Sequence, residues 1–189
     1  MQLTGALREE YARLFATCVI RVEYLDDVAC TVANVVRNRE RYESVARPLG
    51  MPWHVVGILH SLEASLRFDR HLHSGDPLTD RTQHVPTGRP PEGTPPFAWE
   101  ESAFDALVFA RMHEWCDWSI PGTLYCLEQY NGFGYRVHHP DVLSPYLWSF
   151  SNHYTHGKYV ADGRWSKTAI SEQCGGAVLL KRMVASGNM

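Results

Sequence analysis

The chain has 189 residues, of which 44% are hydrophobic and 21% charged, and its formal net charge is -3 at neutral pH. These values exclude intrinsic disorder, and the lack of an apolar run of about 18 residues argues against a membrane-spanning helix. A slightly negative net charge gives no overall positive electrostatic potential, so we expect neither nucleic acid nor a membrane as a partner. The length fits a single domain, and we expect a monomer.

The cysteines and the start of the chain indicate where the protein is made. Five scattered cysteines, with no Cys-x-x-Cys pair, do not imply a disulfide framework. Cys18 and Cys30 lie in apolar helical patterns and are expected to be buried. The opening residues MQLTGALREEYARLF carry acids and no continuous apolar run, so they do not resemble a signal peptide. We therefore expect synthesis in a reducing cytoplasm.

The first part of the chain has the periodicity of helices. Apolar residues within 7–18 recur on one helical face, and the spacing predicts a second helix over 26–45 that begins at an acidic cap. The sequence Arg-Pro-Leu-Gly at 47–50 ends this pattern. A third helix is predicted over 52–66, with proline at its first position.

Residues 68–98 interrupt the helical rhythm. Residues 81–85 can form a short strand, and 86–98 hold five of the eleven prolines, which is typical of a long irregular loop. Further helices are predicted over 99–115, 121–130 and 169–184. The expected fold class is mainly α, as one domain over 1–189 with a helical N-terminal region (1–47), a second region (48–189), and a small irregular or β insertion after the third helix.

Glu63 is the first candidate functional residue. It lies on the flank of the apolar stripe of the third predicted helix, three residues after His60. A carboxyl near a helix end and beside apolar groups loses solvation, which favours its protonated form. A general acid that protonates a glycosidic oxygen requires this form. A structural glutamate paired with an arginine, or one exposed on the helix flank, would give the same pattern.

A second candidate is the turn Gln129-Tyr130-Asn131-Gly132 at the end of a predicted helix. Asn and Gly at these positions fit the left-handed end of a helix. The same turn presents a phenol from Tyr130 and an amide from Asn131, two groups suited to a sugar hydroxyl or N-acetyl group. We expect both residues to contact a glycan, with the cleft formed by the third-helix end, the loop 69–98 and this turn.

Together these motifs carry a family resemblance. The apolar helix ILHSLEAS around Glu63, followed downstream by Tyr130-Asn131-Gly132, resembles the lysozyme-like superfamily, nearest to goose-type lysozymes and lytic transglycosylases. The stretch from Trp53 to Pro91, which contains HSLEASLRFDRHLHSGDPLTDRTQHVPTGRPP, is similar to bacterial and phage lysozyme family proteins, as is LSPYLWSFSNHYTHGKYVADG. The resemblance covers about residues 40–182.

The resemblance implies a lysozyme-like α+β domain that cleaves the β-1,4 bond between N-acetylmuramic acid and N-acetylglucosamine in peptidoglycan, without a cofactor. Glu63 matches the catalytic acid/base, and Tyr130 and Asn131 match residues that line the cleft. Such an enzyme would reach the cell wall after release from the cytoplasm, through phage-type lysis or another non-classical route. Its partners would be peptidoglycan glycan strands.

The chain also departs from the family's motifs. Ala64 replaces the serine that follows the glutamate in transglycosylases, and a Gly-Leu-Met-Gln motif is missing. Phage lysozymes carry Asp and Thr where this chain has Leu72 and Leu78. The family's motifs therefore do not supply a second catalytic carboxylate. Asp76 is the best candidate to orient a water opposite Glu63. An aspartate before proline is also a common turn residue, and this structural role for Asp76 is weighed equally with the catalytic one. A lytic transglycosylase would not need this water.

Other residues extend the candidate site or suggest other functions. His60 and Thr82 are candidate substrate contacts, of which Thr82 could also position water, and Trp148 could stack on a sugar face. His60, His71, His73 and Asp76 have the chemistry of zinc ligands, so a zinc-dependent amidase or peptidase is an alternative. No His-Glu-x-x-His occurs, and we expect no metal; His71 and His73 should instead bond the turn backbone or nearby carboxylates. A glycan-binding module without catalysis is a third possibility.

Overall fold

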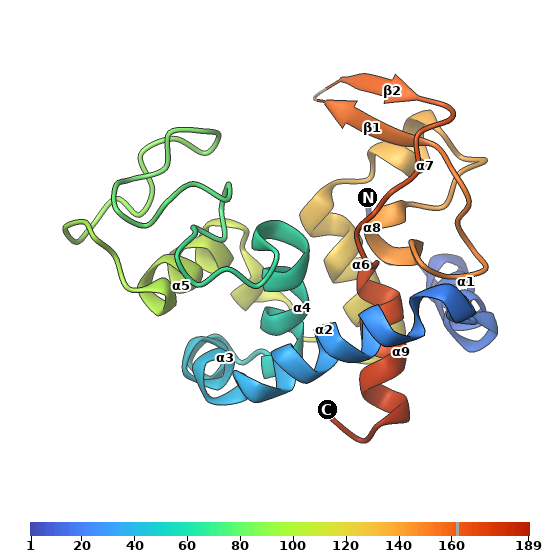
Figure 1. Ribbon diagram of the computed structural model, residues 1–189, viewed down its shortest axis with the longest axis horizontal. Helices are drawn as coiled ribbons and strands as arrows, with labels where there is room; N and C mark the ends of the chain where they lie inside the picture. Colours follow the sequence, from blue (N-terminus) through green and yellow to red (C-terminus); the bar gives the residue numbers. More distant parts are fainter. Residues whose placement is uncertain (162) are drawn as a thin grey trace. The chain divides into compact units, whose positions relative to one another are not determined.

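The computed structural model describes residues 1–161 and 163–189, and in these residues the chain is mainly helical, as expected (Figure 1). The two-stranded sheet found in the described residues lies within 158–166 and not in the insertion predicted over 68–98. It divides into two compact units. Unit 1 comprises Met1–Val32 and Ser119–Asn188, and unit 2 comprises Ala33–Trp118 and Met189. Among the described helices, none has both the length and the apolar character needed to cross a lipid bilayer.

Unit 1 is organised around helix α6 (Ile120–Asn131), which packs against α1 (Gly5–Thr17), α8 (Pro145–Trp148) and α9 (Gly176–Ala185). The helix begins at Ser119, whose hydroxyl accepts the N–H of Gly122, and has proline in its first turn. The other elements of unit 1 are η1 (Val22–Tyr24), the first part of α2 (Leu25–Arg37), α7 (Gly134–His138), and the antiparallel strands β1 (Lys158–Ala161) and β2 (Arg164–Ser166).

A buried ionic network joins three helices of unit 1. The Tyr11 hydroxyl of α1 donates to Glu128 of α6 at 2.5 Å, and burial raises the pKa of this phenol, so it remains a donor. Arg136 of α7 donates to Glu128 at 2.9 Å and to Glu10 at 2.8 Å. Each charge in this cluster therefore has an opposite charge or a hydrogen-bond donor beside it, as burial of charge requires.

Unit 2 contains the end of α2, then α3 (Arg39–Ala46), η2 (Arg47–Leu49), α4 (Trp53–Ala64), α5 (Trp99–Phe109) and η3 (Met112–Glu114). Helix α3 packs against both α4 and α5. Gly57 allows a close approach within this unit, because a Cβ there would lie 2.4 Å from a methyl carbon of Val35. Figure 1 shows the long green segment that connects α4 to α5 without regular secondary structure.

Three predicted helices differ from those observed. The helix predicted over 99–115 ends at Phe109, because Arg111 has a φ of 58° that a helix cannot accommodate, and the short η3 follows. The helix predicted over 26–45 is broken into α2 and α3 at Asn38, whose side-chain amide donates to the backbone oxygen of Asn34 and so competes with the helical ladder. The last helix begins at Gly176 and not at residue 169. Gly175, the residue before this helix, packs directly against the backbone of Leu147. A Cβ at Gly175 would come within 2.3 Å of the Leu147 carbonyl oxygen.

Two other expectations were wrong. Residues 81–85 form no strand, because Thr82 donates its backbone N–H to Arg89 and the next two N–H groups are bound by the Asp76 carboxylate. The insertion is therefore irregular, apart from an isolated bridge between Arg70 and Pro77. Cys18 is buried as expected, but Cys30 is exposed on α2.

Candidate functional site

Helix α4 is buried on all sides except at Glu63. Each of its other residues, from Trp53 to Ala64, is buried, whereas Glu63 is half-buried. Glu63 stands in the last turn of the helix, one residue before its end at Ala64. It is therefore the residue of α4 that combines partial burial with access to solvent.

The backbone just after Glu63 adopts an uncommon conformation. Ser65 and Leu66 both have positive φ, 50° and 60°, and both backbone N–H groups point to the carbonyl oxygen of His60. Two consecutive non-glycine residues in this region cost about 1–2 kcal/mol each. The chain then returns to the helix end at Gly75, where a Cβ would lie 3.7 Å from the Glu63 carbonyl oxygen. The turn that carries Asp76 thus lies beside the backbone of Glu63.

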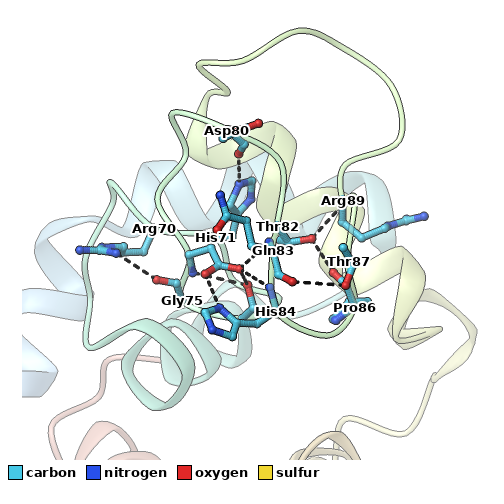
Figure 2. Close-up of polar contacts among 12 residues, drawn as sticks. Arg70, His71, Gly75, Asp80, Thr82, Gln83, His84, Pro86, Thr87 and Arg89 are labelled. Carbon is cyan, nitrogen blue, oxygen red and sulfur yellow. Dashed lines mark hydrogen bonds and ion pairs between the residues drawn. The ribbon is translucent and has the colours of Figure 1, made fainter.

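Asp76 organises the loop that follows, and two of its partners, Gln83 and His84, are labelled in Figure 2. Its carboxylate accepts the backbone N–H groups of Gln83 and His84, each at 2.9 Å, and the hydroxyl of Ser74 at 2.8 Å. It also lies 2.6 Å from Nδ1 of His84. Desolvation alone would raise the pKa of Asp76, but these hydrogen bonds outweigh it and hold the pKa well below its usual range.

These contacts change the role expected for Asp76. A carboxylate has about four acceptor sites, and Asp76 uses four within its own loop. It is a permanently ionised group that fixes the loop, with little acceptor capacity left for a water. His84, which the sequence did not single out, is the residue that Asp76 holds toward solvent. Eight residues separate the two in a region without periodicity, so no spacing rule could have connected them.

Three other residues expected at the site are buried. His60 has 0% exposure, contacts Tyr42 through Nδ1 at 3.0 Å, and packs against the ring of Trp99. Thr82 is 2% exposed; its hydroxyl bonds the backbone of Pro86 and accepts the N–H of Arg89. Trp148, in unit 1, is 1% exposed. In this conformation none of the three side chains offers surface to a sugar, and each supports packing or loop structure.

Tyr130 and Asn131 belong to unit 1, at the end of α6. Tyr130 is half-buried and Asn131 exposed, and Gly132 ends the helix with a φ of 86°. Gly132 thus has a positive φ, but its ψ of 151° lies outside the left-handed helical region that was expected at this helix end. Both side chains reach the surface of unit 1 at this helix end, where they are accessible to a ligand.

The histidines considered as zinc ligands have other partners. His71 bonds the Ser102 hydroxyl at 2.6 Å and the backbone oxygen of Asp80 at 2.7 Å, and His73 bonds Asp105 at 2.8 Å. The expectation that they bond backbone and carboxylate groups is confirmed. Within residues 1–161 and 163–189, no three His, Cys, Asp or Glu side chains are grouped so that they could hold a metal ion.

Unit 2 also contains an open groove of about 770 Å³. Its walls come from α3, α5 and the loop between Pro90 and Phe97, and its lining includes Phe104 and Val108. Glu63, Asp76 and His84 do not line it. The groove is thus a feature distinct from the end of α4.

Comparison of the chain with known protein families, with curated proteins and with solved structures finds no match.

Proposed function

We propose that this protein is a peptidoglycan-degrading glycosidase that cleaves the β-1,4 bond between N-acetylmuramic acid and N-acetylglucosamine, with Glu63 as the general acid. The observation that carries the proposal is the position of Glu63, the one residue of α4 with access to solvent on a helix that is otherwise buried. The backbone strain at Ser65 and Leu66 gives further support, because strained backbone clusters at functional sites.

In the proposed reaction, Glu63 donates its proton to the glycosidic oxygen as the bond to the anomeric carbon breaks. This avoids an alkoxide leaving group, and general acid catalysis of this kind contributes about 10²–10⁴-fold to a rate. Tyr130 and Asn131 are proposed to bind the glycan through hydrogen bonds. The motifs that resemble lysozymes and lytic transglycosylases support the choice of this substrate.

Lytic transglycosylation of the same bond is the second candidate, and the contacts of Asp76 favour it. An inverting hydrolase places a second carboxylate where it can activate water. Asp76 has its acceptor sites occupied within the loop, so it does not fill that role in this conformation. In a transglycosylase the attacking oxygen is a hydroxyl of the sugar itself, so no second carboxylate is needed to activate a water.

The test is digestion of purified peptidoglycan by the wild type and by Glu63→Gln, followed by mass spectrometry of the products. The glutamine keeps the size of the side chain but cannot donate the acidic proton, so we expect at least a hundredfold loss of cleavage with an unchanged circular dichroism spectrum. Glu101→Gln, on the exposed side of α5, is the matched control and should cleave normally.

The products separate the two reactions, because hydrolysis leaves reducing ends whereas transglycosylation leaves 1,6-anhydro ends. Full activity of Glu63→Gln would refute the proposed role of Glu63. Binding of peptidoglycan without cleavage by the wild type would indicate a glycan-binding module. Cleavage of the stem peptide that a chelator abolishes would indicate the zinc-dependent amidase.

A further inference from the structure

His84 has the geometry of an activated base. Its side chain is 79% exposed, while that of Asp76 is 9% exposed, and the distance from His84 Nδ1 to Asp76 Oδ1 is 2.6 Å. In Figure 2 the ring of the labelled His84 lies at the end of a dashed line that marks this contact. In the pair formed by Asp76 and His84, the carboxylate is thus buried and fixed, and the imidazole is open to a ligand.

The partner of Nδ1 determines which nitrogen of the ring can accept a proton. An ionised carboxylate only accepts hydrogen bonds, so Nδ1 carries the hydrogen and donates it to Asp76. In the neutral ring, Nε2 then holds the free electron pair. A carboxylate in this position fixes the orientation of the ring and its tautomer, as the aspartate does in serine protease triads.

The loop contacts connect this base with the proposed acid. Gly75 lies against the backbone of Glu63, Asp76 follows it, and Asp76 holds both the ring and the backbone of His84. All of these residues belong to unit 2. The end of α4 and the exposed imidazole are therefore linked through one fixed carboxylate.

We propose that His84, held by Asp76, is the catalytic base of the reaction in which Glu63 is the acid; this inference rests on the proposed function. The bond between the anomeric carbon and the glycosidic oxygen breaks, and that oxygen takes the proton of Glu63. A bond forms between the anomeric carbon and the attacking oxygen, from water or from a hydroxyl of the sugar, and the proton of that oxygen passes to Nε2 of His84. Transfer of this proton through solvent to Glu63 restores both groups.

The variant His84→Asn tests the inference without removing the loop contact. The asparagine amide nitrogen takes the place of Nδ1 and can still donate to Asp76, but nothing replaces Nε2. We expect a loss of cleavage of purified peptidoglycan of at least a hundredfold, with an unchanged melting temperature. His113→Asn is the matched control, because His113 is an exposed histidine of the same unit whose nearest carboxylate, that of Glu114, lies 3.9 Å away.

Azide provides the second measurement. It is an anionic nucleophile that needs no base, so it should partly restore bond cleavage by His84→Asn and yield a glycosyl azide visible by mass spectrometry. It should not restore Glu63→Gln, because that variant still lacks the acid. Normal cleavage by His84→Asn, or a loss that azide does not restore, would overturn the role of His84 as a base. Activity of Glu63→Gln would instead overturn the proposed function itself.

Asp76 acts through His84 and is thus a positioning residue. In Asp76→Asn the side-chain oxygen can still accept the backbone N–H groups, but the amide would donate to Nδ1 and leave the proton on Nε2. We expect kcat to fall with little change in KM. A change in KM alone, with kcat unchanged, would indicate that Asp76 only shapes the loop.

Discussion

Acidification should destabilise unit 2 through two buried histidines of α4. Burial lowers the pKa of His54 and of His60 from 6.5 to about 4. In the unfolded chain both rings take up a proton near pH 6.5, whereas in the folded protein they remain neutral down to about pH 4. Because the folded pKa values are the lower ones, the stabilising contribution is complete above pH 6.5 and is lost as the pH falls toward 4.

The size of the effect follows from the difference in bound protons. Between the two pKa values, each histidine changes the free energy of unfolding by about 1.4 kcal/mol per pH unit. Between pH 7 and pH 5 this amounts to about 2 kcal/mol for each ring, or about 4 kcal/mol for both. A typical protein has a free energy of unfolding of only about 5–15 kcal/mol, so the loss should be large.

Urea unfolding at several pH values, followed by tryptophan fluorescence, would measure this loss. Trp99 is a suitable reporter because its ring centroid lies 4.5 Å from that of His60. The double variant His54→Asn/His60→Asn should show a clearly smaller dependence on pH between 7 and 5, although it is less stable at pH 7. His138→Asn, at an exposed histidine, should keep the full dependence. An unchanged pH dependence in the double variant would refute this reasoning.

Two further predictions concern packing and buried charge. Gly175→Ala should lower the melting temperature strongly, because its Cβ would come within 2.3 Å of a backbone oxygen in α8. Gly134→Ala is the control: its Cβ would enter open space, so this variant should melt like the wild type. Equal melting temperatures of the two variants would contradict the close approach at Gly175. Arg136→Met should cost roughly 3–5 kcal/mol in urea unfolding, because it leaves the buried Glu128 carboxylate without its positive partner. The exposed pair formed by Arg111 gives the comparison, and a similar result for Arg111→Met would mean that burial of the pair does not matter.

The sequence predicted the helices well where one face is apolar or a cap is present. Periodicity and proline located α4 to within two residues, and the helix predicted over 121–130 matches α6 to within one residue at each end. The sequence predicted the ends of helices less well where a single side chain or a close contact ends the helix. Asn38 breaks a helix by a local hydrogen bond, and Gly175 delays the start of α9 through a contact with a segment almost thirty residues earlier. Neither effect leaves a periodic pattern of apolar residues in the sequence, so periodicity could not predict it.

The candidate site was predictable in its helical part only. Glu63 was found from its position in an apolar helix, and its partial exposure agrees with that prediction. The role of Asp76 depends on four hydrogen bonds to residues up to eight positions away, and the strand predicted over 81–85 would have placed those N–H groups in a ladder. His60 and Trp148 were chosen for their chemistry, and burial, which depends on the whole fold, gave them structural roles.

The burial of α4 has a consequence for how unit 2 opens. Because nearly all of its residues are covered, its backbone amides can exchange with solvent only when the surrounding elements separate. We expect the amides at the centre of this helix to exchange at the rate of global unfolding, and those of the loop after it to exchange much faster. The proposed acid would then stand at the border between a slowly exchanging helix and a more exposed loop, in which amides with a hydrogen-bond partner, such as the two bound by Asp76, are expected to be the most protected.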